Sequence, residues 1–203
     1  IENVLKFMPN KRQTLLFSAT LPANIVRISK KYLTNPARVD VSDNVGPPIS
    51  IKQDILRIKD ADKYPNLLSQ LKERNGSIII FVKTKSSTEK LAKKLSNDGF
   101  STDAIHGDLR QSKRERVLRN FRNMKYRILV ATDVAARGLD IPHIQHVINY
   151  DIPQCADDYI HRIGRTARAG ADGGSLILVT QSDKSKWKVI EKILNFGSND
   201  FNT

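Results

Sequence analysis

Ser77-Ile-Ile-Ile-Phe-Val82 and Arg127-Ile-Leu-Val-Ala131 are the two stretches that decide the fold of this 203-residue chain. Both are apolar on both faces of a strand, which is typical of parallel strands that helices cover on either side. Strands that alternate with amphipathic helices predict an α/β fold with a doubly wound parallel sheet. The other predicted strands are Ser50–Ile58, Ser101–Ile105, His146–Asn149 and Ser175–Thr180. The predicted helices are Ala61–Arg74, Ser87–Asn97, Gln111–Asn123, Ala156–Ile163 and Lys184–Leu194.

Two local signals refine the second of these helices. Ser86-Ser-Thr-Glu89 has the spacing of a capping box, in which a hydroxyl and a carboxylate satisfy free amide groups at the start of a helix. Gly99 follows the helix, where a residue with positive φ is expected.

The first 46 residues form a separate region in this interpretation. Gln13–Ser18 reads as a strand, a helix that begins near Pro22 follows it, and Ala37–Val41 reads as a further short strand. Ser42-Asp-Asn-Val-Gly-Pro-Pro48 is rich in turn-forming residues and is the best linker candidate. We therefore expect one unit at residues 1–46 and a complete domain at residues 47–203.

Composition narrows the class of protein. Lys and Arg number 34 against 21 Asp and Glu, so the net charge is +13, and an excess of this size favours a polyanionic partner. The alternative is a basic surface that only water contacts. A single cysteine, Cys155, excludes an internal disulfide and indicates a reducing compartment, so we expect a cytoplasmic location. The longest apolar run is too short to cross a bilayer, and no membrane partner is expected.

Ligands of open parallel sheets bind at the carboxyl ends of the strands, so the segments that follow strands are the candidate sites. Ala131–Asp140 carries a hydroxyl, two carboxylates and an arginine in a turn of small residues, which suits polar contacts with a ligand. The alternative is that Thr132 or Asp133 only caps a short helix. The histidines lack the spacing of a zinc site, and no metal site is predicted in the chain.

His161–Gly170 places three arginines three residues apart, at Arg162, Arg165 and Arg168. Guanidinium groups that converge repel one another unless an anion joins them, and their planar geometry matches phosphate oxygens. The alternative is a solvated basic helix end. A second basic segment, the helix after His106-Gly-Asp108, offers its N-terminus and Arg114 to a phosphate backbone.

These segments resemble, in order and spacing, the motifs of the DEAD-box RNA helicases of superfamily 2. The matching segments are Ser18-Ala-Thr20, Ile80-Phe-Val-Lys-Thr84, His106-Gly-Asp108, Gln111-Ser-Lys-Arg114, Ala131–Asp140 and His161–Gly170. The resemblance covers all of the chain except its final residues. It implies a RecA-like second domain at residues 47–203 and the tail of a first RecA-like domain at residues 1–46.

The resemblance also implies roles for individual residues. Arg165 and Arg168 correspond to arginines that reach the γ-phosphate of ATP, Arg162 braces their loop, and Ala167 stands where the family more often has glycine. We expect the methyl group of Ala167 to be tolerated if φ there is negative. The residues matched to ATP binding are Gly138 and Asp140; those matched to the RNA backbone are Thr84, Gly107, Arg114, Thr132 and Asp133; those matched to coupling of hydrolysis with domain closure are Ser18 and Thr20.

The chain contains neither a Gly-x-x-x-x-Gly-Lys-Ser/Thr loop nor an Asp-Glu-Ala-Asp sequence. The resemblance therefore implies that ATP and Mg²⁺ are held by an upstream RecA-like domain and that this piece is inactive alone. The implied partners are RNA, bound through its backbone without sequence specificity, that upstream domain, and ribosomal or RNA-decay proteins. Two alternatives stay open, namely a DNA helicase of the same superfamily and a nucleic-acid-binding module without catalysis.

Overall fold

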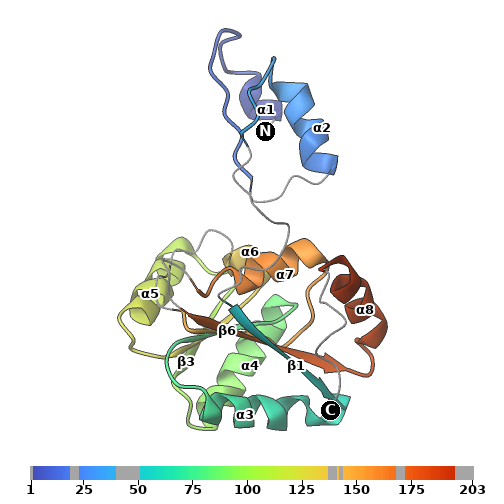
Figure 1. Ribbon diagram of the computed structural model, residues 1–203. Coiled ribbons are helices and arrows are strands. Elements are labelled where there is room, and N and C mark those ends of the chain that lie inside the picture. Colours follow the sequence, from blue (N-terminus) through green and yellow to red (C-terminus); the bar gives the residue numbers. More distant parts are fainter. Residues whose placement is uncertain are drawn as a thin grey trace. The chain divides into compact units, whose positions relative to one another are not determined.

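A computed structural model describes residues 2–18, 23–39, 51–136, 141, 144–167 and 172–194. The chain divides into two compact units, residues 1–44 and residues 45–203 (Figure 1). The predicted boundary between residues 46 and 47 falls in the segment 40–50, which lies outside the described residues. In the part of the chain that is described, no helix is both long and apolar enough to span a bilayer.

The second unit is built on a parallel sheet of six strands in the order β1-β6-β5-β2-β4-β3. The strands are β1 (Ile51–Ile58), β2 (Ile78–Phe81), β3 (Thr102–Ile105), β4 (Ile128–Ala131), β5 (His146–Asn149) and β6 (Gly173–Thr180). All four residues of β2 and of β4 are buried, because these strands lie inside the sheet and helices cover both of its faces. The predicted doubly wound parallel sheet is confirmed.

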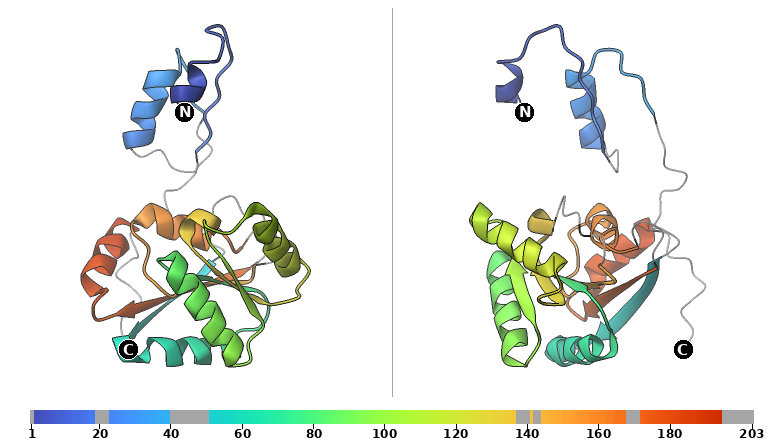
Figure 2. Two further views of the ribbon diagram at one scale, coloured as in Figure 1. Left: turned by 180° about the vertical axis from the view of Figure 1, so that it is seen from behind. Right: turned by 90° about the vertical axis from the view of Figure 1, so that its left-hand side faces the viewer.

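Helices of the second unit pack on both faces of this sheet (Figures 1 and 2). They are the 3₁₀ turn η1 (Asp60–Asp62), α3 (Lys63–Glu73), α4 (Lys85–Asn97), α5 (Gln111–Arg122), α6 (Asp133–Ala136), α7 (Ala156–Ile163) and α8 (Lys184–Ile193). One face of the sheet packs against α3 and α4 through buried leucines such as Leu71 and Leu95. The other face packs against α5 and α6 through Val117 and Phe121, and against α7 and α8 through Trp187. Alternate residues of one strand serve the two faces, as expected for a sheet with two cores.

The start of α4 differs from the predicted capping box by two residues. Thr84 is the N-cap, and its hydroxyl accepts a hydrogen bond from the Ser87 amide at 3.1 Å, while the Thr84 amide donates to Ser87 Oγ at 3.1 Å. Glu89 takes no part in this cap, because its carboxylate lies 2.9 Å from His106 Nε2 instead. Gly99 has φ of +86°, as predicted for the residue that ends this helix.

The first unit holds two helices, α1 (Glu2–Leu5) and α2 (Ala23–Tyr32), and α2 matches the helix expected after Pro22. The strand predicted at Gln13–Ser18 is wrong, because the described residues of this segment have no regular secondary structure. A strand forms only when a neighbour pairs with it, and the described residues of the first unit provide none. Residues 37–39 are likewise irregular, and the rest of the predicted strand Ala37–Val41 lies outside the described residues.

Candidate functional site

The segments that follow β2, β4 and β3 meet at one edge of the sheet, because these three strands are neighbours and all run parallel. Backbone hydrogen bonds tie the segments together: the Val82 amide donates to the Ala131 carbonyl at 3.0 Å, and the Thr132 amide donates to the Ile105 carbonyl at 3.3 Å. The residues that the sequence assigned to this edge come from all three segments. They are Thr84 after β2, Gly107 after β3, and Thr132 and Asp133 after β4.

Thr84 and Gly107 are the exposed members of this edge. Gly107 does not have a positive φ, and a Cβ atom built on it would meet, among the described residues, only Lys85 Cε at 3.8 Å. That distance is ordinary van der Waals contact, so neither the backbone conformation nor the packing of this domain requires glycine there. The missing side chain leaves the backbone of residue 107 open to close approach from outside.

Arg114 and Asp133 are both engaged within the domain. Arg114 lies on α5, and its Nη2 donates to the Ala135 carbonyl of α6 at 2.7 Å, which ties the two helices together. Thr132 is buried and Asp133 begins α6, so the short helix that was weighed as the alternative for this segment is present.

Arg162 on α7 is the most densely bonded side chain of the site and is only 2% exposed. Its Nε and Nη2 donate to the two carboxylate oxygens of Asp133 at 2.6 and 2.8 Å, a bidentate ion pair. Its Nη1 donates to Asn149 Oδ1 at 3.2 Å and to the Asp151 carbonyl at 2.6 Å. The guanidinium carbon lies 5.1 Å from the ring centroid of Phe81. With so many partners inside the domain, Arg162 holds β4, β5 and β2 to α7, which is the bracing geometry.

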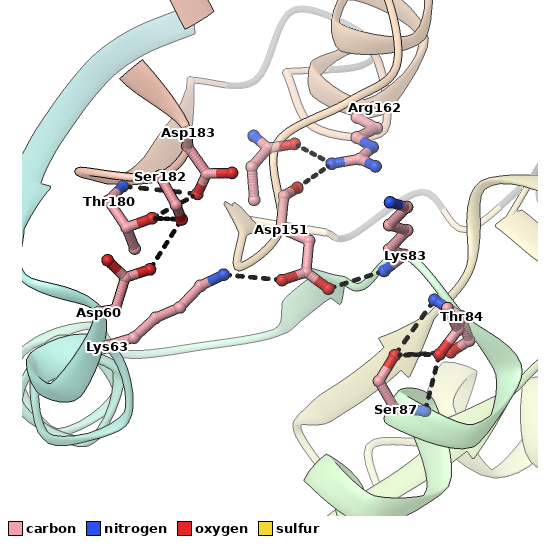
Figure 3. A network of polar contacts seen from close by, with 11 residues as sticks. Asp60, Lys63, Lys83, Thr84, Ser87, Asp151, Arg162, Thr180, Ser182 and Asp183 are labelled. Atoms are coloured by element: carbon pink, nitrogen blue, oxygen red, sulfur yellow. Dashed lines mark hydrogen bonds and ion pairs between the residues drawn. The ribbon is translucent and has the colours of Figure 1, made fainter. Parts of the chain in front are cut away.

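Asp151 follows β5 and extends this network to the next segment (Figure 3). Its Oδ1 accepts from Lys63 Nζ at 2.7 Å, and its Oδ2 accepts from the amide of Lys83 at 2.8 Å, next to Thr84. Its carbonyl accepts from Arg162. One residue therefore joins the segment that carries Thr84 to the helix that carries Arg162. Sequence reasoning missed Asp151, although its place directly after a strand is the signal that found the other loops.

Arg165 lies at the end of α7, half-buried, and its Nε donates to the His161 carbonyl at 3.0 Å. A small pocket opens beside it. The pocket is lined by Phe81, Asp133, Ala136, Asp158, His161, Arg162 and Arg165. Arg165 thus lies at the carboxyl edge of the sheet, at the same pocket as the Arg162–Asp133 ion pair.

Ala167 has φ of +53°, so the negative φ at which its methyl group was expected to be tolerated is not present. The methyl group stands in the left-handed region, where L-residues other than glycine are strained. Ser18 is described and exposed in the first unit. The other assigned residues, Thr20, Gly138, Asp140 and Arg168, lie outside the described residues.

Cys155 is the N-cap of α7, close in sequence to the acidic residues of that helix. Partial burial of its sulfur, and then the negative charge of Asp158, raise the pKa of the thiol, which disfavours a role as nucleophile. Within the described ranges, no three His, Cys, Asp or Glu side chains gather closely enough to hold a metal ion.

The family model named helicase conserved C-terminal domain matches residues 61–170. A DEAD-box ATP-dependent RNA helicase, CshA of Bacillus subtilis, is 42% identical over 193 residues, which are 95% of this chain and 39% of that protein. The chain belongs to the DEAD-box helicase family. This helicase domain is also 45% identical over 196 residues to the ATP-dependent rRNA helicase RRP3 of Coccidioides immitis, which is 96% of the chain and 41% of the relative. The chain thus spans about two fifths of the length of these curated relatives.

Solved structures agree with the assignment of the helicase domain. Dbp5 of S. cerevisiae bound to RNA and ADP BeF3 superposes with a TM-score of 0.84 at 34% identity, over 94% of this chain and 51% of that one. A DEAD box protein from Methanococcus jannaschii superposes with a TM-score of 0.70 at 37% identity, over 97% of this chain and 53% of that one. The RecA-like fold implied by the sequence resemblance is confirmed.

Proposed function

We propose that this chain is the C-terminal part of an ATP-dependent RNA helicase that separates short RNA duplexes or remodels RNA–protein complexes. The observation that carries the proposal is the bidentate pair between Arg162 and Asp133. The pair joins α7, which ends just before Arg165, to α6 after β4, and through Asp151 the same network reaches Lys83 beside Thr84. A guanidinium suited to phosphate and a hydroxyl suited to RNA therefore lie on one connected framework.

In this proposal ATP and Mg²⁺ are held by a P-loop domain, and this chain supplies groups that complete the site when the two domains close. Arg165 and Arg168 stabilise the charge that develops on the γ-phosphoryl oxygens, and Gly138 and Asp140 contact the nucleotide, with the carboxylate suited to ribose hydroxyls. Ser18 and Thr20 couple hydrolysis to domain closure. Arg162 acts indirectly, by holding Asp133 and the loop after β5.

RNA binds along the edge formed by Thr84, Gly107, Arg114, Thr132 and Asp133. Hydroxyl, backbone amide and guanidinium groups contact phosphate oxygens, and a carboxylate accepts from a 2′-hydroxyl, so binding follows backbone shape rather than base sequence. The net charge of +13 supports a polyanionic partner. The state of the relative Dbp5, bound to RNA and ADP BeF3, supports the same pair of ligands here.

We also propose a cytoplasmic location and protein partners from ribosome assembly or RNA decay. A relative is named as an rRNA helicase, and E. coli SrmB is bound to a regulator of ribonuclease activity in its structure, at 36% identity and a TM-score of 0.66 over 70% of this chain and 85% of that one. These two relatives support that class of partner.

The test is RNA-stimulated ATP hydrolysis by this chain alone and after mixing with the P-loop domain of the same protein. The chain alone is expected to release no phosphate, and the mixture is expected to hydrolyse ATP when single-stranded RNA is added. Arg165→Ala or Arg168→Ala in the mixture should lower the rate by about 10³–10⁵-fold, the range of arginine fingers. Turnover by the chain alone, or equal rates with and without Arg168, would contradict the proposal.

A further inference from the structure

Two polar contacts join the first turns of α4 to the segment after β3, one on each side of Gly107. Lys85 Nζ lies 2.5 Å from Asp108 Oδ1, and Glu89 Oε1 lies 2.9 Å from His106 Nε2. Lys85 and Glu89 are four residues apart, so they lie on one face of the helix. We call these two contacts the α4 clasp.

The clasp acts where the sheet gives the least support. β3 is the last strand in the order and pairs, among the described strands, only with β4. The segment that carries Gly107 therefore follows an edge strand, and the two contacts tie this segment to α4. Thr84 is the N-cap of the same helix. One helix therefore begins at Thr84 and also holds the backbone around Gly107, and both residues are assigned to RNA binding.

The two contacts differ in burial. Lys85 and Asp108 are exposed, with side chains 56% and 65% accessible, and such a pair is weak in water. The His106 side chain is only 6% accessible, and its Nδ1 has no hydrogen-bond partner among the described residues. The Glu89 carboxylate is therefore the hydrogen-bond partner of this ring, and its loss would leave both ring nitrogens buried without a partner among the described residues. The Glu89–His106 contact is the stronger half of the clasp.

We propose that Glu89 is a positioning residue for RNA binding: through His106 it fixes the Gly107 backbone at a set distance from Thr84, so that both contact one RNA backbone. This inference rests on the proposed function. The negative charge of Glu89 by itself repels RNA phosphates and weakens binding, whereas the proposed positioning role strengthens binding. The sign of the effect therefore separates positioning from simple electrostatics.

The experiment compares two variants of equal charge, Glu89→Gln and Glu89→Leu, in this chain. Glutamine keeps an oxygen that accepts from His106, whereas leucine does not, and both residues are good helix formers. The probe is a fluorescein-labelled single-stranded oligouridylate followed by anisotropy at low salt. We expect Glu89→Gln to bind within about twofold of the original chain, and Glu89→Leu to bind about five- to tenfold more weakly, as for loss of one typical hydrogen bond.

Glu115→Leu is the matched control, since Glu115 is an exposed carboxylate on α5 that accepts a hydrogen bond from Gln111 of the same helix. If electrostatics alone governs binding, all three variants should tighten it equally. A second measurement is hydrogen exchange of the amides of residues 106–109, which we expect to speed up in Glu89→Leu and not in Glu89→Gln.

The outcomes separate the two proposals. Equal affinities and equal exchange in Glu89→Leu and Glu89→Gln would overturn the positioning role while leaving RNA binding intact. Faster exchange in Glu89→Leu with unchanged affinity would also overturn it, because the clasp would then be structural only. An original chain that binds no RNA would overturn the proposed RNA edge itself, and the positioning role with it.

Discussion

Replacing Arg162 with alanine should destabilise the second unit strongly, because the guanidinium is a brace with four hydrogen bonds inside the domain. The change leaves the Asp133 carboxylate, whose side chain is 23% exposed, without its partner. It also removes donors from the fully buried Asn149 and from the Asp151 carbonyl. Removal of one partner of a buried ion pair costs about 3–5 kcal/mol, and the unpaired acceptors place this case within that range. The expected loss in the free energy of unfolding is therefore about 4 kcal/mol.

Urea unfolding followed by the fluorescence of Trp187 measures this loss. Trp187 is the only tryptophan of the chain, is 1% exposed, and packs edge-on against Tyr159 of α7 with ring centroids 5.6 Å apart. Its emission therefore reports the packing of α8 on the helix that carries Arg162. Arg165→Ala is the control, since this half-buried arginine makes a backbone contact at the end of the same helix and its removal should cost under about 1 kcal/mol.

A double-mutant cycle isolates the ion pair from the other contacts. Arg162→Met combined with Asp133→Asn should be more stable than the sum of the two single changes predicts, with a coupling of about 1–3 kcal/mol. The bracing interpretation would be refuted by a loss below about 1 kcal/mol in Arg162→Ala, or by a coupling indistinguishable from zero. In either case the guanidinium would be available for a ligand rather than committed to the fold.

Three further predictions follow from single positions. Gly107→Ala should leave the urea midpoint unchanged, because the new Cβ meets only ordinary contact, but should weaken binding of single-stranded RNA in the anisotropy assay. Ala167→Gly should raise the free energy of unfolding by about 0.5–1 kcal/mol, since it relieves a left-handed alanine; an unchanged urea midpoint would speak against that strain. Burial, and then the charge of Arg74, lower the pKa of His146 below its usual 6.5, so the free energy of unfolding is at its full value above that pH and decreases as the pH falls through it. His146→Gln should flatten this decrease in urea titrations between about pH 6.5 and 5, and an identical pH dependence in the variant would contradict the assignment.

Much of the fold could be predicted because its signals are local. Ile78–Phe81 and Ile128–Ala131 are apolar at every position, and this pattern alone indicates strands covered on both faces. The helix between Ala156 and Ile163 was also predicted to the residue, because its amphipathic pattern is likewise a local signal. The strand predicted at Gln13–Ser18 failed because its pattern is local but a strand needs a partner from elsewhere in the chain.

The site was less predictable because its contacts are distant in sequence. The spacing that made Glu89 a capping residue is equally compatible with its bond to His106, and only the fold brings β3 beside α4. The partners of Arg162 lie on α6, in β5 and just after β5, so the spacing of three arginines could not reveal that one of them is already bonded. Asp151 carries no motif-like signal of its own beyond its place after a strand.

The pairing of β1 with β6 has a consequence for how this domain is synthesised. β1 is the first strand of the second unit, yet its partner is the last: Ile51 pairs with Gly173 and Ile58 with Thr180, about 120 residues further along. At about 5–20 residues per second, a ribosome needs about 6–24 s to make that interval. The half of the sheet formed by β2, β4 and β3 is complete well before β6 leaves the exit tunnel. The backbone of β1 therefore stays without its sheet partner while β2, β4 and β3 assemble, and a nascent chain that stops short of residue 173 cannot complete the sheet at this edge.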